Sequence, residues 1–135
     1  HRIGALVWSS GANLILNLAT HWNDGDKDSS DPIERESCRP DFVGMLCPWP
    51  DKQSVSDFPF KKEDPPAWAC SARDDVVAPT AFAAGIVDAY HQVGAQARLW
   101  TVAEGGHRAF DRVSGDGSKW PDHFIAWLKE LKMWK

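Results

Sequence analysis

Three residue types that together could carry out nucleophilic catalysis each follow a short apolar run in this sequence. They are Ser9, the neighbouring pair Asp74 and Asp75, and His107. A serine hydroxyl becomes a nucleophile when an imidazole takes its proton, and a carboxylate on the other imidazole nitrogen stabilises the imidazolium that forms. The carboxyl ends of parallel strands converge on one crevice, which would bring such residues together. The sequence therefore predicts a Ser-His-Asp triad with Ser9 as the nucleophile and His107 as the base.

The elements that must position these residues are predicted from the apolar pattern. Apolar runs bounded by turn residues are typical of buried strands, and apolar residues at helical spacing indicate helices. The expected order is a strand over 1–8, a helix over 12–20, strands over 42–47 and 67–72, a helix over 80–94, a strand over 96–103 and a helix over 120–134. Such alternation implies parallel strands joined by right-handed crossovers. We expect an α/β fold of about four parallel strands with flanking helices, one domain over 1–135, and loop excursions at 21–40 and 48–66.

Composition excludes several classes of protein. The chain has 135 residues, of which 43% are hydrophobic and 25% charged, as is ordinary for one globular domain. Its net charge of -4 argues against a nucleic-acid partner. No apolar run reaches the roughly 18 residues of a membrane span, and no signal peptide is visible. We expect a soluble protein that binds neither nucleic acid nor membranes, with a cytoplasmic location as the default.

Metal and disulfide sites are not expected. Residues 24–35 imitate the opening of a calcium loop, but Ser29 stands where glycine is needed and Arg35 where a bidentate glutamate belongs. The three cysteines lack the paired spacing of a zinc site or of a disulfide framework. Reduced thiols are therefore the expectation for Cys38, Cys47 and Cys70.

Four blocks of the sequence resemble α/β-hydrolase esterases related to acetyl-xylan esterases and other short-chain carboxylesterases, a group related to the prolyl oligopeptidases. The blocks are RIGALVWSSGANLILNLAT, CRPDFVGMLCPWP, PPAWACSARDDVVAP and LWTVAEGGHRAF. They resemble the nucleophile elbow, the strand after it, the acid loop and the histidine loop, and the order Ser, Asp, His is that of α/β-hydrolases. The resemblance implies a partial α/β-hydrolase fold that matches the C-terminal half of such an esterase. It also implies hydrolysis of short-chain esters, including acetyl esters of carbohydrates, with no cofactor; a serine peptidase or an arylformamidase is an alternative on the same fold.

The elbow residues take their roles from this resemblance. Ser9 stands at the nucleophile position of VWSSG, where the family has G-x-S-x-G. Val7 departs from the pattern at the first glycine, so it should either bend the elbow or require a compensating gap. Gly11 is retained, and the backbone N–H of Ser10 takes the place of one oxyanion donor.

The triad acid has two candidates. Asp75 lies four residues before Pro79 and 32 before His107, as in family members with a single aspartate in this loop. Asp74 fits a variant with one extra residue. We favour Asp75, and the other aspartate should then face solvent or cap the loop.

The expected partners are a small ester substrate and further polypeptide. Trp8 and Trp49 are the two tryptophans near the crevice that could contact substrate. No segment resembles the His-Gly-Gly loop that supplies a second oxyanion donor in such esterases. The apolar strand at 2–8 would also present an unpaired edge. We therefore expect a homo-oligomer or a missing N-terminal hydrolase segment, and the alternative function is a catalytically impaired module that binds itself or a partner.

Overall fold

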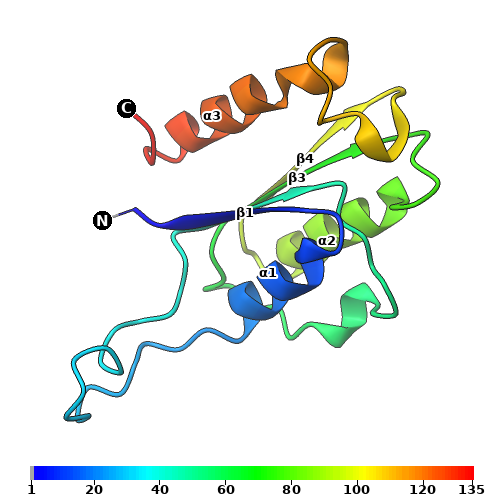
Figure 1. Cartoon of the computed structure of the whole chain (residues 1–135). Helices are drawn as coiled ribbons and strands as arrows, with labels where there is room; N and C mark the ends of the chain where they lie inside the picture. Colours follow the sequence, from blue (N-terminus) through cyan, green and yellow to red (C-terminus); the bar gives the residue numbers. More distant parts are fainter. Residues whose placement is uncertain (1) are drawn as a thin grey trace.

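The structure is a computed structural model that describes residues 2–135, and its elements follow the expected order (Figure 1). The strands and α-helices are β1 (Gly4–Trp8), α1 (Gly11–Thr20), β2 (Phe42–Leu46), β3 (Ala67–Ala72), α2 (Thr80–Gln92), β4 (Ala97–Val102) and α3 (Trp120–Glu130). Three short 3-10 turns are η1 (Val55–Asp57), η2 (Gly106–Arg108) and η3 (Asp116–Lys119). His1, which the sequence placed in the first strand, lies outside the described residues. α3 ends at Glu130 rather than at residue 134, because Lys132 adopts a left-handed φ of 59° that a helix cannot continue through.

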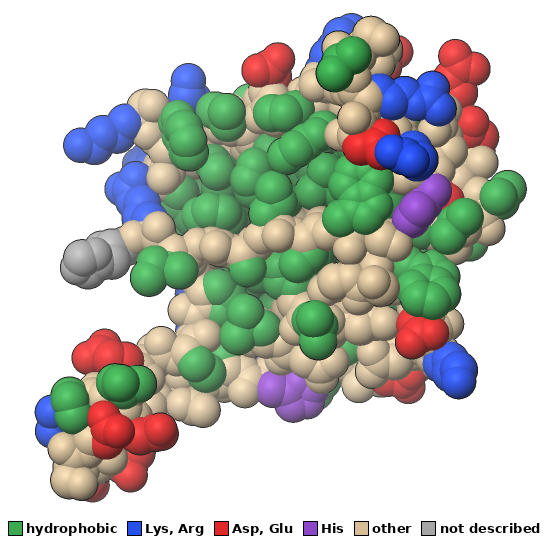
Figure 2. All heavy atoms as spheres, viewed as in Figure 1, with side chains coloured by type: hydrophobic (Ala, Val, Ile, Leu, Met, Phe, Trp, Pro, Cys, Tyr) green, Lys and Arg blue, Asp and Glu red, His purple; other side chains and the backbone are tan. Residues whose placement is uncertain are grey.

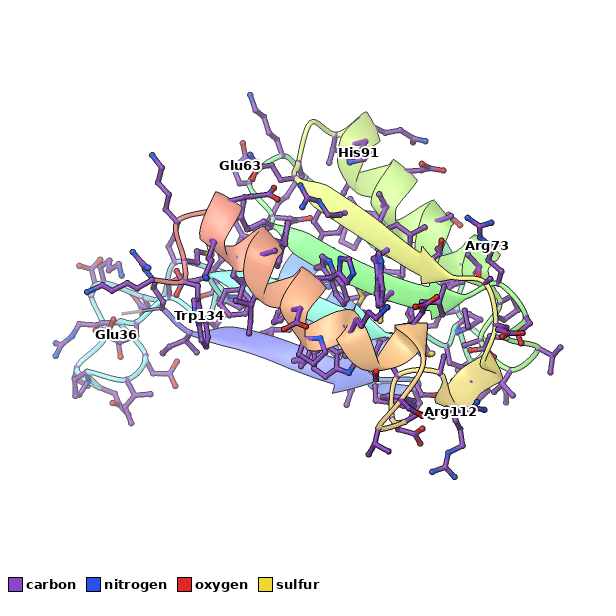
Figure 3. The ribbon with its side chains drawn as sticks, turned by 90° about the horizontal axis from the view of Figure 1, so that it is seen from above. Glu36, Glu63, Arg73, His91, Arg112 and Trp134 are labelled. Carbon is purple, nitrogen blue, oxygen red and sulfur yellow. The ribbon has the colours of Figure 1, made fainter. Side chains whose placement is uncertain are left out.

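The four strands form one parallel sheet in the order β1-β2-β3-β4. α1 and α2 cover one face, and α3 crosses the other (Figures 1 and 3). Side chains of β3 alternate between the two cores, with Ala67 and Ala69 toward α1 and α2 and with Trp68 and Cys70 toward α3. All six residues of β3 are buried, as expected for a central strand covered on both faces. The expected α/β class of fold is confirmed.

β1 is an edge strand, and it pairs only with β2 among the described residues. Large apolar side chains are exposed on β1 and beside it, and Figure 2 shows apolar side chains on both sides of this strand. They are Ile3, Leu6, Leu14 and Leu18. The edge therefore combines open backbone groups with apolar surface.

The two loop excursions start at opposite ends of the sheet, and they meet where the Arg39 side chain donates to the Glu63 carbonyl at 2.9 Å. Residues 21–40 hold no helix or strand and extend away from the sheet, with Glu36 beyond the end opposite to Arg73 and Arg112 in Figure 3. Residues 48–66 begin at the carboxyl end of β2 and contain η1, where the backbone N–H of Ser54 donates to the Asp57 carboxylate at 2.7 Å. Only the second excursion therefore starts beside the strand ends that carry the candidate site.

Among residues 2–135, no helix combines the length and the apolar character that crossing a membrane requires.

Candidate active site

Ser9 occupies a tight turn between β1 and α1. Its φ of 52° lies in the left-handed region, which residues other than glycine rarely adopt and which is typical of strained functional turns. The turn is held by backbone bonds: the Ser9 N–H donates to the Leu46 carbonyl at 2.9 Å, and the Ser9 carbonyl accepts from Ala12 at 3.0 Å and Trp49 at 3.2 Å. The hydroxyl is thereby held at the carboxyl end of the sheet.

The departure from G-x-S-x-G at Val7 is accommodated by Gly11. A Cβ built on Gly11 would lie 2.9 Å from the Val7 Cβ, closer than real Cβ contacts allow. The valine side chain therefore fills the space that a residue larger than glycine would need at position 11. This is the compensating gap that a β-branched residue at position 7 required.

His107 lies between Ser9 and Asp75. Its Nε2 is 2.8 Å from the Ser9 Oγ, and its Nδ1 is 2.8 Å from the Asp75 Oδ2. A carboxylate can only accept, so the proton belongs on Nδ1, and Nε2 then accepts from the serine hydroxyl. The three side chains form one continuous hydrogen-bonded chain, although Ser9 and His107 are 98 residues apart in sequence.

Asp75 is held as a fully partnered carboxylate. Its side chain is completely buried, whereas that of His107 is 20% exposed. Oδ1 accepts the backbone N–H groups of Val77 and Ala78, both at 2.8 Å, and Oδ2 accepts from His107. These bonds offset the cost of removing a carboxylate from water and leave the imidazole partner with one orientation.

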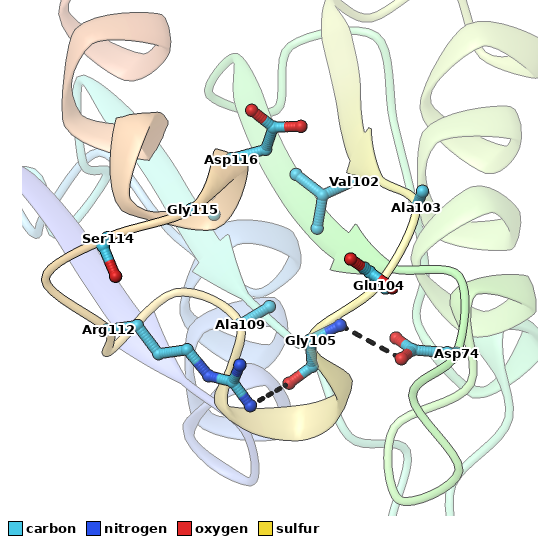
Figure 4. A pocket seen from close by; sticks show the side chains of 11 residues that line it. Asp74, Val102, Ala103, Glu104, Gly105, Ala109, Arg112, Ser114, Gly115 and Asp116 are labelled. Carbon is cyan, nitrogen blue, oxygen red and sulfur yellow. Dashed lines mark hydrogen bonds between the residues drawn. The ribbon is translucent and has the colours of Figure 1, made fainter.

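Asp74, the other candidate acid, has different partners. Its two carboxylate oxygens accept the backbone N–H groups of Gly106 at 2.8 Å and Gly105 at 3.0 Å, and Figure 4 shows the bond to Gly105. These bonds, first that of Gly106 and then that of Gly105, lower the pKa of the Asp74 carboxyl. The Asp74 side chain is exposed, which agrees with the expectation that the second aspartate faces solvent, and its carboxylate accepts from the loop that precedes His107. The acid loop thus contacts the His107 imidazole through Asp75 and the backbone before His107 through Asp74.

The other expected site residues lie around this chain of bonds. The N–H of Ser10, at the amino end of α1, makes no hydrogen bond within residues 2–135. The Trp8 ring meets the His107 ring edge to face, with centroids 6.2 Å apart and an interplanar angle of 79°. Trp49 joins the site through its backbone bond to Ser9, and its side chain is half-buried. Contact of either tryptophan with substrate stays a prediction.

Cys47 also belongs to this site, although the sequence analysis did not predict it. It follows β2 with a φ of 46°, and its buried Sγ–H donates to the His107 carbonyl at 3.5 Å. Burial, and then the charge of Asp75, raise the pKa of the Cys47 thiol to about 12, so the thiol remains protonated at neutral pH.

Three atoms of this site are of types that bind soft metals, and they lie within 4.8 Å of one another. They are the Cys47 Sγ, a carboxylate oxygen of Asp75 and a ring nitrogen of His107. The His107 nitrogens and the Asp75 oxygens already have hydrogen-bond partners, however. Its place at a strand end was the signal that could have identified Cys47.

Comparison with known proteins supports the fold. No protein-family model and no curated protein sequence matches the chain. Among solved structures, it superposes on the acetyl ester-xyloside bifunctional hydrolase of Caldicellulosiruptor lactoaceticus with a TM-score of 0.84 at 22% identity, over 98% of this chain and 57% of that one. A carboxylesterase of Lactobacillus plantarum gives a TM-score of 0.73 at 13% identity, over 99% of this chain and 60% of that one. Esterase 2 of Thermogutta terrifontis gives a TM-score of 0.73 at 14% identity, and the match covers 98% of this chain and 56% of that one.

These likenesses define the class of fold. The chain spans somewhat more than half the length of each of these three structures. Four parallel strands with helices on both faces, superposed on esterases of this kind, make the fold that of an α/β-hydrolase.

Proposed function

We propose that this chain is a serine ester hydrolase in which Ser9 is the nucleophile, His107 the general base and Asp75 the orienting acid. The observation that carries the proposal is the unbroken chain of two 2.8 Å hydrogen bonds that joins these side chains. The strained turn at Ser9 and the complete burial of the Asp75 carboxylate support it, because both cost free energy that a purely structural role would not require. Esters are favoured as the substrate class because the structures of similar fold are esterases.

The geometry suggests a two-step acyl transfer. The Ser9 Oγ attacks the ester carbonyl carbon as its proton passes to the Nε2 of His107. The oxyanion of the tetrahedral intermediate accepts a hydrogen bond from the backbone N–H of Ser10. Asp75 stabilises the imidazolium. His107 then returns the proton to the departing alkoxide oxygen, which leaves as an alcohol and leaves an acyl group on Ser9. Water, losing its proton to Nε2, attacks the acyl carbonyl, and the carboxylic acid departs as the proton returns to Ser9.

We propose short acyl chains, including acetyl groups on carbohydrates, as the substrates. Support comes from two structures with this fold: the acetyl ester-xyloside hydrolase, and a truncated carbohydrate esterase from gut microbiota that matches with a TM-score of 0.67 at 16% identity, over 93% of this chain and 59% of that one. The half-buried rings of Trp8 and Trp49 would offer flat apolar surface beside the reacting carbonyl. Each step above uses groups of the polypeptide, and we propose no cofactor.

The second candidate function is a module that associates without turnover. The exposed apolar side chains along β1 favour it, because an open sheet edge with apolar surface is a template for another strand. One oxyanion donor, Ser10, is assigned in the proposed site, and loss of one such donor lowers rates by about 10² to 10³.

A fluorophosphonate probe tests the proposal directly. It should label the protein at Ser9, and Ser9→Ala and His107→Ala should abolish both the labelling and the hydrolysis of p-nitrophenyl acetate. Ser10→Ala is the matched control, since it removes the neighbouring hydroxyl but keeps the backbone N–H. Labelling that persists in the Ser9→Ala protein would refute the nucleophile, and a folded protein that never labels would favour the non-catalytic module.

A further inference from the structure

The loop that carries His107 has a hollow behind it. Residues 103–107, here called the histidine loop, run from the end of β4 to η2, and a cavity of about 490 Å³ lies against them (Figure 4). Glu104 and Gly105 of this loop line one side of the cavity, and η3 lines the opposite side. Asp74 and Arg112 also line it. No side chain among residues 2–135 fills this space, so the loop has no packing contact there and its hydrogen bonds gain importance.

Those bonds converge on two consecutive peptide groups. Gly105 and Gly106 have φ values of 125° and 61°, and this backbone conformation turns both N–H groups toward the Asp74 carboxylate. Successive N–H groups that converge in this way form a natural site for an anionic oxygen pair. On its other side, the Gly105 carbonyl accepts from the Arg112 side chain at 3.3 Å. A Cβ on Gly105 would lie 2.8 Å from the Ala109 Cβ, so the tight turn also excludes larger residues there.

We propose that Asp74 is a positioning residue for the reaction: by holding the backbone of Gly105 and Gly106, its carboxylate keeps the His107 imidazole within reach of Ser9. The proposal builds on the proposed function. Asp74 and Asp75 are adjacent, so one short loop holds both the ring of His107 and the backbone that leads to it. A single loop therefore orients both the imidazole of His107 and the backbone that precedes it.

The carboxylate form is required. Each oxygen of Asp74 accepts one N–H, whereas an asparagine offers one oxygen and an NH₂ group that would face a backbone donor. Asp74→Asn therefore loses one bond and gains a donor-donor contact. We expect kcat for a small soluble ester to fall by about 10- to 100-fold with KM nearly unchanged, since small displacements of a catalytic group cost this much.

Glu104→Gln is the matched control. Glu104 lies on the same loop and lines the same cavity, and its carboxylate makes no hydrogen bond to the described residues. The substitution removes the same charge at a similar place without removing a loop contact. A purely long-range effect of charge on His107 would appear in both variants, whereas loss of positioning would appear in Asp74→Asn alone.

Amide exchange measured by NMR tests the positioning without turnover. In the wild type, the Gly105 and Gly106 amides should exchange slowly and shift as the Asp74 carboxyl titrates, and the His107 Nδ1 proton should give a downfield signal. In Asp74→Asn, exchange of both amides should accelerate and the Nδ1 signal should broaden, with neither change in Glu104→Gln. Because Asp74 is exposed, we expect the variant to fold, and the wild-type titration tests the same bonds without a variant.

Two results would overturn the inference. One is unchanged exchange and an unchanged His107 signal in Asp74→Asn; the other is equal loss of kcat in Asp74→Asn and Glu104→Gln. If the wild type shows the NMR signatures but never labels with fluorophosphonate, the bonds to the loop stand and the proposed hydrolase function fails. The two failures are therefore distinguishable.

Discussion

Ser9 and His107 meet at one hydrogen bond, but the segments that carry them are stabilised differently. The elbow around Ser9 is enclosed by backbone bonds to β2 and α1 and by the contact of Val7 with Gly11. The histidine loop lies against a hollow and depends on hydrogen bonds to Asp74, Arg112 and Cys47. The elbow, here called the packed half, is held by backbone hydrogen bonds and by close packing of Val7 on Gly11. The histidine loop with its partners, here called the polar half, is held by hydrogen bonds to side chains.

The two halves should therefore be sensitive to different kinds of substitution. A packed turn is sensitive to the size of its side chains, because the interior cannot expand to accept another methyl group. A loop held by a carboxylate is sensitive to charge and to pH, because protonation removes an acceptor. Substitutions should therefore affect the two halves through different observables.

The largest expected effect comes from the polar half. Asp75→Asn should lower kcat by about 10⁴ with the fold retained, since the amide favours the wrong imidazole tautomer. Asp74→Asn should have a much smaller effect, because it acts on the backbone of the loop rather than on the ring. Steady-state kinetics with p-nitrophenyl acetate rank the two, and a larger loss in Asp74→Asn would show that the acid was wrongly chosen.

The packed half should respond to size and not to charge. Gly11→Ala should destabilise the protein by about 1 to 3 kcal/mol, because its Cβ would overlap the Val7 Cβ. In a Val7→Gly background the same alanine should cost less, which a double-mutant cycle of urea denaturation measures. Costs that simply add would mean that the two residues do not share this space.

A smaller effect is expected in the pH dependence of stability. The bonds from Gly106 and Gly105 lower the pKa of Asp74 in the folded protein relative to the unfolded chain. Its stabilisation is therefore present above the unfolded pKa of about 3.9 and is lost as the pH falls through the lower folded value. The difference in Tm between wild type and Asp74→Asn should persist at neutral pH and shrink in acid. A difference that grows on acidification would contradict this sign.

The smallest effect concerns the open side of the elbow strand. We propose that copies of the chain associate through β1, whose Leu6 is 43% exposed. Leu6→Lys should shift sedimentation equilibrium at micromolar concentration toward monomer. Val113→Lys, at a fully exposed site away from the sheet, is the matched control and should not. A strictly monomeric wild type would refute association through this edge.

Most of the fold followed from local pattern. The apolar runs 42–47 and 67–72 are short and bounded by turn residues, which favours buried strands, and they contain β2 and β3, the two interior strands of the sheet. The expected helices formed where apolar residues recur at helical spacing. The end of α3 was predicted too late, because a left-handed residue such as Lys132 has no strong sequence signature.

The candidate site was predictable in part. Residue types at strand ends pointed to Ser9 and His107, and spacing favoured Asp75 over Asp74 as the triad acid. The role of Asp75 as triad acid stays a prediction. The position of Cys47 at a strand end could have marked it as a site residue. Its bond to the His107 carbonyl and the bonds of Asp74 were not predictable, because they depend on which loop lies opposite a side chain after folding.

The α/β class of fold and the residue types at the strand ends were predictable from local pattern, since hydrophobic periodicity and turn residues act over a few neighbours. The partners of the two aspartates became known from the folded structure, where Asp75 lies in the buried interior and Asp74 at the surface. The close approach of Val7 and Gly11 also follows from the folded structure. Both outcomes depend on contacts between segments, whose distances are set by packing of the whole sheet and not by local conformational preference.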